Sequence, residues 1–406
     1  MKKYCITTYG CQANISDSER MEAALARAGY FLSENEKDAD LIIINACSVR
    51  QSAVDRVYGR ICEIKKKSDA EIIVTGCLLK RDREKISEIA RFLDTKSLFR
   101  LFVPDNPKNY FSIRPKYRNS FSAYVPVMTG CNNFCSYCAV PYTRGREKSR
   151  TFKEILKETK DLISAGYKEL WLLGQNVNSY REGRNNFSFL LRTISDIDGN
   201  FWIRFTSSHP KDLGADIIET MANSKKITDY LNLPVQSGDS QILKKMNRPY
   251  NISDYKRCVG RIRKKIPEIF LSTDVIVGFP GETEKQFHNT VNLFREIEFD
   301  MAYISRYSPR PGTPASYFTD NVDPSKKRER EKVLNNILQK IIFKKNKALV
   351  GKKMDVLVER KRKEYLLGKT RQYKTVKFKG DPALIGSFLR IKITKALPWG
   401  LEGEIN

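Results

Sequence analysis

The sequence predicts an α/β protein of three parts: an open parallel α/β sheet over residues 1–115, a partial (β/α) barrel of six strands over 120–346, and a small all-β part over 347–406. Three observations predict this class. Strand and helix patterns alternate in the first part, a strand-then-helix unit repeats in the second, and short strand patterns fill the third. With 406 residues, the chain is long enough for several domains that each bury a core.

Three strand patterns of the first part each run into a cysteine. They read "KKYCITTYG", "LIIINAC" and "EIIVTGC", and the cysteines at or just beyond their ends are Cys11, Cys47 and Cys77. The helical pattern after the first strand ends at Gly29, a residue suited to a helix C-cap. Because the carboxyl ends of parallel strands share one edge of a sheet, where ligands bind, we expect the three thiols to converge. Three buried structural thiols are the alternative.

Residues 103–120 carry three Pro and few apolar residues, which predicts a linker. Strand patterns then alternate with helical segments, which predicts a partial barrel whose chemistry lies on the loops after the strands. Those loops are polar or rich in Gly and Pro, as in "GQNVNS", "SSHPKD" and "GFPGET". The predicted barrel strands are 123–128, 169–173, 201–206, 230–235, 269–277 and 301–307.

The loop after the first barrel strand reads "GCNNFCSYCAVPY" and places Cys131, Cys135 and Cys138 at the spacing CxxxCxxC, with Tyr137 as a flat face beside the last thiol. Structural zinc usually closes with a fourth Cys or His, and a ferredoxin-like run supplies a fourth Cys. Zinc is therefore the alternative that this spacing disfavours. Three thiols without a fourth predict a metal site that keeps one position open for a substrate or cofactor.

The charge of the chain indicates a polyanionic partner. There are 73 Lys and Arg against 47 Asp and Glu, a net charge of +26 that favours nucleic acid. Residues 324–406 alone hold 23 Lys and Arg against 8 Asp and Glu, so we expect the contact to concentrate there. An odd count of nine Cys, a start without an apolar segment and no apolar run of membrane-spanning length lead us to expect a cytoplasmic protein with no membrane partner.

The cysteine loop resembles that of the radical S-adenosylmethionine (SAM) enzymes, whose signature is three Cys at this spacing with an aromatic residue before the last. The resemblance implies that the three thiols hold a [4Fe-4S] cluster whose open iron chelates SAM, and that cleavage of SAM yields a radical that abstracts hydrogen from the substrate. The residues then expected to contact SAM are Tyr137, Gln175, Asn176, Ser207 and Gln236. Turn or cap roles are the alternative for the last four. For His209 we expect an ordinary loop hydrogen bond.

The first part resembles the methylthiotransferases of that superfamily through "TYGCQAN", "NACSVR" and "TGC". This resemblance implies that Cys11, Cys47 and Cys77 hold a second [4Fe-4S] cluster, whose open iron carries the sulfur that is joined to the substrate radical. A second SAM would supply the methyl group. The remaining thiols, Cys5, Cys62 and Cys258, are expected to be structural.

The cysteine loop and the tail resemble the branch that methylthiolates N-6-isopentenyladenosine next to the anticodon of tRNA, in which the tail is a TRAM RNA-binding domain. This implies tRNA, a sulfur donor and an electron donor as partners, and we expect a monomer. Sister enzymes that act on threonylcarbamoyladenosine in tRNA or on an aspartate of a ribosomal protein are alternatives, as is a non-catalytic iron-sulfur RNA-binding protein. Residues expected to contact RNA are Arg144, Arg146, Lys148 and Arg150 beyond the cysteine loop, and Lys369, Arg371 and Lys374 in the tail, where Tyr373 could stack on a base.

Overall fold

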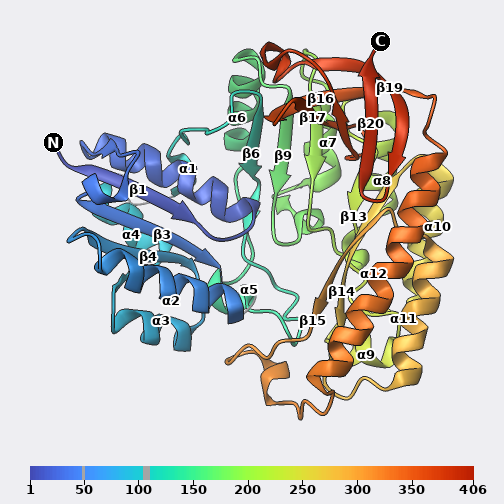
Figure 1. Cartoon of the computed structure of the whole chain (residues 1–406), viewed down its shortest axis with the longest axis horizontal. Coiled ribbons are helices and arrows are strands. Elements are labelled where there is room, and N and C mark those ends of the chain that lie inside the picture. Colours follow the sequence, from blue (N-terminus) through green and yellow to red (C-terminus); the bar gives the residue numbers. More distant parts are fainter. Residues whose placement is uncertain (48–50, 104–109) are drawn as a thin grey trace.

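The computed structural model describes residues 1–47, 51–103 and 110–406, and its N-terminal part is an open parallel sheet (Figure 1). The strands are β1 (Lys3–Thr8), β2 (Phe31–Leu32), β3 (Leu41–Cys47), β4 (Glu71–Cys77) and β5 (Arg91–Phe92), in the order β2-β1-β3-β4-β5. One face is covered by α1 (Gln12–Arg27) and α4 (Thr95–Phe102), the other by α2 (Gln51–Lys65) and α3 (Lys80–Ser87). Helices on both faces explain why the central strands read as nearly continuous apolar runs.

The central part is a partial barrel, with six parallel strands among the described residues. They are β6 (Ser122–Pro126), β9 (Glu169–Leu173), β12 (Trp202–Phe205), β13 (Tyr230–Asn232), β14 (Phe270–Val277) and β15 (Met301–Arg306). Two three-stranded sheets, β6-β9-β12 and β13-β14-β15, meet at an isolated parallel bridge between Ile203 and Ile227. Each predicted strand is present, although the one predicted over 230–235 already ends at Asn232.

Helices pack around the outside of this barrel and short elements form its loops (Figure 1). The helices are α6 (Phe152–Ser164), α7 (Phe187–Ser195), α8 (Ala215–Asn223), α10 (Ile252–Lys265), α11 (Glu284–Ile297) and α12 (Pro324–Lys347). The short elements are α5 (Val140–Thr143), α9 (Ser240–Lys245), β7 (Met128–Thr129) paired with β8 (Lys148–Ser149), and β10 (Arg181–Glu182) paired with β11 (Asn185–Asn186).

The segment predicted as a linker packs between the first two parts of the molecule. Its residues 104–109 lie outside the described residues. In the rest, Phe111 and Ile113 are buried. The Tyr117 hydroxyl donates to Glu158 of α6 at 2.6 Å, and Arg118 pairs with Glu22 of α1 at 2.6 Å. The described part of this segment therefore fixes the N-terminal sheet against the barrel.

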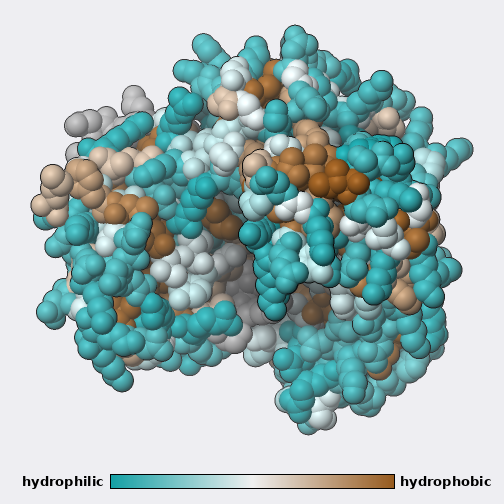
Figure 2. Space-filling model, turned by 45° about the horizontal axis from the view of Figure 1, so that its top comes forward, coloured by the Kyte–Doolittle hydropathy of each residue, from teal (hydrophilic) through white to brown (hydrophobic). Residues whose placement is uncertain are grey.

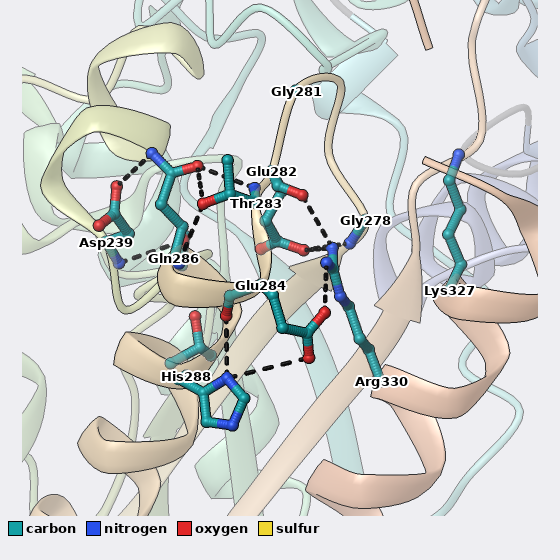
Figure 3. A network of polar contacts seen from close by, with 12 residues as sticks. Asp239, Gly278, Gly281, Glu282, Thr283, Glu284, Gln286, His288, Lys327 and Arg330 are labelled. Carbon is teal, nitrogen blue, oxygen red and sulfur yellow. Dashed lines mark hydrogen bonds and ion pairs between the residues drawn. The ribbon is translucent and has the colours of Figure 1, made fainter. Parts of the chain in front are cut away.

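The "GFPGET" loop after β14 is a joint between β14, α11 and α12 (Figure 3). Glu282 accepts hydrogen bonds from the Gly278 N–H at 2.7 Å and from Arg330 of α12 at 2.8 Å, and both charged side chains are buried. Thr283 and Gln286 cap the start of α11 reciprocally. These contacts connect the loop after β14 to both α11 and α12.

The C-terminal part is a closed β-barrel that lies against the central barrel (Figure 1). Its strands are β16 (Lys353–Arg362), β17 (Tyr365–Thr370), β18 (Thr375–Phe378), β19 (Phe388–Leu397) and β20 (Gly400–Ile405). Trp202 of β12 packs on Phe388 with ring centroids 4.6 Å apart. The molecular face in Figure 2 is mostly hydrophilic and is hollowed between the N-terminal part on the left and the barrel on the right. No helix in the described ranges is both long and apolar enough to cross a membrane.

Candidate active site

The structure gathers the three N-terminal cysteines at the carboxyl edge of the first sheet. Cys47 and Cys77 end β3 and β4 and are partners in the strand register, and Cys11 follows β1 and caps α1. Buried Asn14 in the first turn of α1 lies beside two of them. The Cys11 thiol is 3.4 Å from its Oδ1, and Cys77 Sγ is 4.0 Å from its Nδ2. The sheet therefore places the three cysteines along one edge, and their role as one ligand set stays a prediction.

A cation from the barrel completes the surroundings of this N-terminal trio. Arg144, which follows α5, donates from Nε to Cys77 Sγ at 2.8 Å and pairs through Nη2 with Asp17 of α1 at 2.8 Å. The Arg144 and Asp17 side chains are only 11% and 4% exposed. Burial raises the pKa of the Cys77 thiol, and the Arg144 charge acts in the opposite direction. The loop that carries the central cysteines thus also favours the thiolate form of an N-terminal one.

The central trio sits on the loop between β7 and α5. Cys131 and Cys135 are buried and Cys138 is half-buried. Burial raises the pKa of Cys138 to about 12, and the neighbouring Cys135 and Cys131 add to the rise. Nη1 of buried Arg248 lies 3.5 Å from Cys135 Sγ. Metal-bound thiolates are deprotonated, so thiols that oppose one another's ionisation fit a site in which a cationic centre offsets their charges.

A glycine with positive φ directly precedes one cysteine of each trio. Gly76 has φ +104, and a Cβ there would lie 2.3 Å from the carbonyl oxygen of Ala46 on the neighbouring strand. Gly130 has φ +74, and its Cβ would lie 2.2 Å from the carbonyl oxygen of Arg146. Other residues would be strained and would displace backbone, so glycine is needed for both cysteine positions.

The central trio and Cys11 line one cavity of about 500 Å³. The cavity is the opening that a three-thiol site would leave for a further ligand. In the described ranges, no three His, Cys, Asp or Glu side chains surround a point where a single metal ion could bind. A [4Fe-4S] cluster has a different requirement, because each thiolate binds a different iron. The donor set and the cavity therefore fit a cluster with one open iron better than they fit zinc.

Four of the five residues expected to contact SAM line this cavity: Tyr137, Gln175, Ser207 and Gln236. Ser207 has φ 62 and Gln236 has φ 71, sparsely populated conformations that cluster at functional sites. The expected placement of Asn176 is corrected, because its side chain is buried outside the cavity lining and donates to Asp212 at 2.7 Å. That contact anchors the loop after β9.

The sequence gives no expectation for Arg248 and Asp274, which also line the cavity. Burial raises the pKa of the Asp274 carboxyl, which accepts a hydrogen bond from Asn232 at 3.1 Å. An acid inside the apolar strand "FLSTDVIV" was the signal that could have identified it. Arg248 lies in no recognisable motif. His209 makes the expected loop hydrogen bond through Nδ1, from Lys211 N at 3.3 Å, but it lines the cavity as well, and burial lowers its pKa to about 2.

The basic strip beyond the cysteine loop divides into inward and outward side chains. Arg146 and Lys148 are exposed, as expected for RNA contact. Arg150 is buried, pairs with Glu158 at 2.7 Å and donates to the Pro126 carbonyl at 2.7 Å. The expected surface placement is therefore corrected for Arg150. Arg144 is mostly buried by its ion pair with Asp17 but lines a cavity together with Arg146 and Lys148, so its contact with RNA stays a prediction.

The basic residues of the tail are half-buried where the C-terminal barrel meets the central one. Arg371 pairs with Asp229 at 3.2 Å, Lys374 donates to Asn346 at 2.9 Å, and Lys369 donates to Thr375 at 2.7 Å. RNA contact by these three residues stays a prediction, but each side chain already has an intramolecular partner.

Comparison with known proteins first establishes the class. The model of the radical SAM superfamily matches residues 125–294, that of uncharacterized protein family UPF0004 matches 3–96, and that of the TRAM domain matches 347–405. The fold is similar to the radical SAM methyltransferase TsrM from Kitasatospora setae with cobalamin and a [4Fe-4S] cluster bound, with a TM-score of 0.59 and 15% identity, covering 78% of this chain and 77% of that one. The chain is a radical SAM protein, a class whose cofactors are a [4Fe-4S] cluster and SAM.

Curated relatives then define the particular family. The tRNA-2-methylthio-N(6)-dimethylallyladenosine synthase of Clostridium botulinum (strain Langeland) is 43% identical over 99% of this chain and 96% of its own length. The enzymes of the same name from Clostridium novyi (strain NT) and Thermoanaerobacter sp. (strain X514) are 41% and 40% identical, over 100% and 99% of this chain and 96% and 92% of their own lengths. The chain belongs to this family, as the sequence resemblance predicts.

Proposed function

We propose that this chain is the methylthiotransferase that converts N-6-isopentenyladenosine next to the anticodon of tRNA to its 2-methylthio derivative. The observation that carries the proposal is the shared cavity, in which Cys11 of the N-terminal trio stands together with Cys131, Cys135 and Cys138. A reaction that joins a sulfur from one site to a carbon activated at another needs both sites at one opening. The names of the full-length relatives agree with this reaction.

Each trio would hold one [4Fe-4S] cluster, and the two clusters would supply the electron for SAM cleavage and the site for the transferred sulfur. The chain's own residues position the reactants. Gln175, Ser207 and Gln236 offer amide and hydroxyl groups around the mouth of the central trio. Buried Arg248 donates to the Pro234 carbonyl at 2.9 Å, which fixes its charge beside Cys135.

The partners follow from charge and from the relatives. The net charge of +26 and the match to a TRAM domain support tRNA as the polyanion, and exposed Arg146 and Lys148 stand at the cysteine loop where the anticodon arm would approach. We also propose a sulfur donor and an electron donor as partners, and a monomeric chain in the cytoplasm.

The proposed domain boundaries are 1–115, 120–346 and 347–406. They enclose the ranges that the family models match, which are 3–96, 125–294 and 347–405.

The test is turnover by anaerobically reconstituted protein with SAM, a reductant and a set of RNA stem–loops. We expect 5′-deoxyadenosine and a 2-methylthio product on the isopentenyladenosine stem–loop, detected by mass spectrometry of nucleosides. The matched substrates carry adenosine or threonylcarbamoyladenosine at the same position. Product on the threonylcarbamoyladenosine stem–loop alone would show that the chain has the activity of the sister enzymes instead. SAM that stays intact with every RNA would favour a non-catalytic iron-sulfur protein.

A further inference from the structure

A hairpin of the C-terminal barrel is attached rigidly to the central barrel. The hairpin consists of β17 and β18, and its turn runs from Thr370, the last residue of β17, to Lys374. Buried Arg204 of β12 donates to the carbonyls of Thr370 and Arg371, at 2.8 Å each, and is itself held by Glu169 at 2.6 Å. Buried hydrogen bonds from a charged guanidinium to backbone carbonyls are difficult to break, so these two contacts fix the turn relative to the barrel.

The other side of the turn is fixed as well. The Arg371 side chain donates to the Ile227 carbonyl at 2.8 Å, in addition to its ion pair with Asp229 at 3.2 Å. Within the turn, Tyr373 N donates to the Thr370 carbonyl at 2.9 Å. Tyr373 is held at φ 63, a left-handed conformation that is a strained outlier for a bulky residue. Such strain persists where the surroundings over-determine the conformation.

This conformation brings Tyr373 into the lining of the same cavity that the cysteines line. Its ring centroid is 5.1 Å from that of Trp171 and 4.9 Å from that of Tyr230. Tyr303 lines the cavity beside them. We call Trp171, Tyr230, Tyr303 and Tyr373 the aromatic wall. Three of its members come from the barrel strands β9, β13 and β15, and the fourth comes from the C-terminal domain.

We infer that Tyr373 is a substrate-binding residue, and that the aromatic wall receives the planar base of the RNA nucleoside that reacts in the cavity. This inference rests on the proposed function and deepens it. An unstacked base is held in proteins on aromatic side chains, because every base presents a π-face. The cavity also lies in the size range of small-molecule sites. The domain that would grip the RNA thereby supplies part of the pocket for the reacting base.

The test uses the full chain and compares two tyrosines of the C-terminal domain. Tyr373 has Lys369 Nζ 4.3 Å from its ring centroid, and Tyr365 has Lys377 Nζ at 4.4 Å, so the two share a cation–π contact and partial burial. Tyr365 is absent from the cavity lining in the described structure, which makes it the matched control. The variants are Tyr373→Ala, Tyr373→Phe and Tyr365→Ala.

We expect Tyr373→Ala to raise the KM for the isopentenyladenosine stem–loop about ten- to a hundredfold, as for the loss of one base–aromatic contact, with the KM for SAM unchanged. Tyr373→Phe keeps the ring and should stay within about threefold of wild type, because stacking needs no hydroxyl. Tyr365→Ala should leave both KM values unchanged. Equal effects of Tyr373→Ala and Tyr365→Ala on RNA, or a rise in the KM for SAM, would overturn the inference.

A binding measurement separates this inference from the proposed reaction. A stem–loop with 2-aminopurine at the reacting position should be more strongly quenched by wild type than by Tyr373→Ala, because the fluorescent base loses a stacking partner. Equal quenching would overturn the inference even if wild type turns over. If wild type quenches the probe but forms no methylthio product, the proposed reaction fails while the base contact stands. Should Tyr373→Ala fail to fold, Tyr373→Leu replaces it, with the same expected loss of quenching.

Discussion

The two cysteine trios are assembled by different routes. The central trio lies on one loop, with Cys131, Cys135 and Cys138 separated by three and two residues. The N-terminal trio is spread over three strand ends and is assembled by the register that pairs Cys47 with Cys77. The first needs only a local turn, whereas the second exists only when the sheet is folded.

The dispersed site depends on its neighbour as well. Arg144 comes from the central part of the chain, yet it donates to Cys77 and pairs with Asp17. Among the described residues, the charged donor at the central trio is Arg248, which belongs to the barrel itself and not to the N-terminal part. Docking of the sheet on the barrel is therefore a condition for the N-terminal trio, and the comparison predicts that the two sites respond differently to mutation.

The largest effects should come from removing one thiol of each trio. Cys135→Ala should reduce both 5′-deoxyadenosine formation and methylthio product to background, because the cluster that activates SAM is lost. Cys77→Ala should abolish the methylthio product but leave SAM cleavage, and each variant should lose about half of the bound iron. Cys62→Ala, in α2 outside both trios, is the control. Loss of SAM cleavage in Cys77→Ala would show that the two sites are not separable.

A second prediction concerns the docking cation. Arg144→Met leaves the buried Asp17 carboxylate without its partner, so the free energy of unfolding should fall by about 3 kcal/mol. Exposed Arg146, whose guanidinium lies 4.3 Å from the Phe134 ring, is the matched control, and Arg146→Met should change stability by less than about 1 kcal/mol. Urea unfolding measures both. Similar losses in the two variants would mean that the Arg144 contact does not hold the domains together.

A third prediction concerns the pH dependence of the same interface. Burial raises the pKa of Glu19 in α1 from 4.5 to about 7, an effect that the Arg118 N–H only partly offsets. The folded state therefore holds this proton more tightly than the unfolded state. The resulting stability is complete below pH 4.5 and is lost as the pH rises through about 7, up to about 3 kcal/mol.

Glu19→Gln keeps the shape of the protonated side chain and should remove this dependence. The difference between variant and wild type in the free energy of unfolding should grow from pH 5 to pH 8, measured by urea unfolding at each pH. Changes at other groups cancel in that difference. A constant difference would show that Glu19 is already ionised at pH 5 in the folded protein.

The strand patterns predicted the architecture well because they report local periodicity. All six barrel strands and the three strand-end cysteines are where the patterns indicate. The side chains named for RNA contact were less predictable. Arg144 and Arg150 occupy the same basic strip as Arg146 and Lys148, but they turn inward to the carboxylates of Asp17 and Glu158. Nothing in the strip shows which cations have a partner, because Asp17 lies 127 residues before Arg144 and Glu158 lies on α6, outside the strip.

By itself, the sequence determined the α/β class, the two sets of three thiols, the family and the excess of positive charge. Spacing and strand-end position depend on residues that are close in sequence, and composition needs no positions at all, so each can be read before the fold is known. Only the tertiary structure decided that Cys11 shares a cavity with the central trio, and that Arg204 seats the turn carrying Tyr373 in the lining of that cavity. These contacts join segments more than a hundred residues apart, and packing between such segments produces no periodic pattern in the sequence.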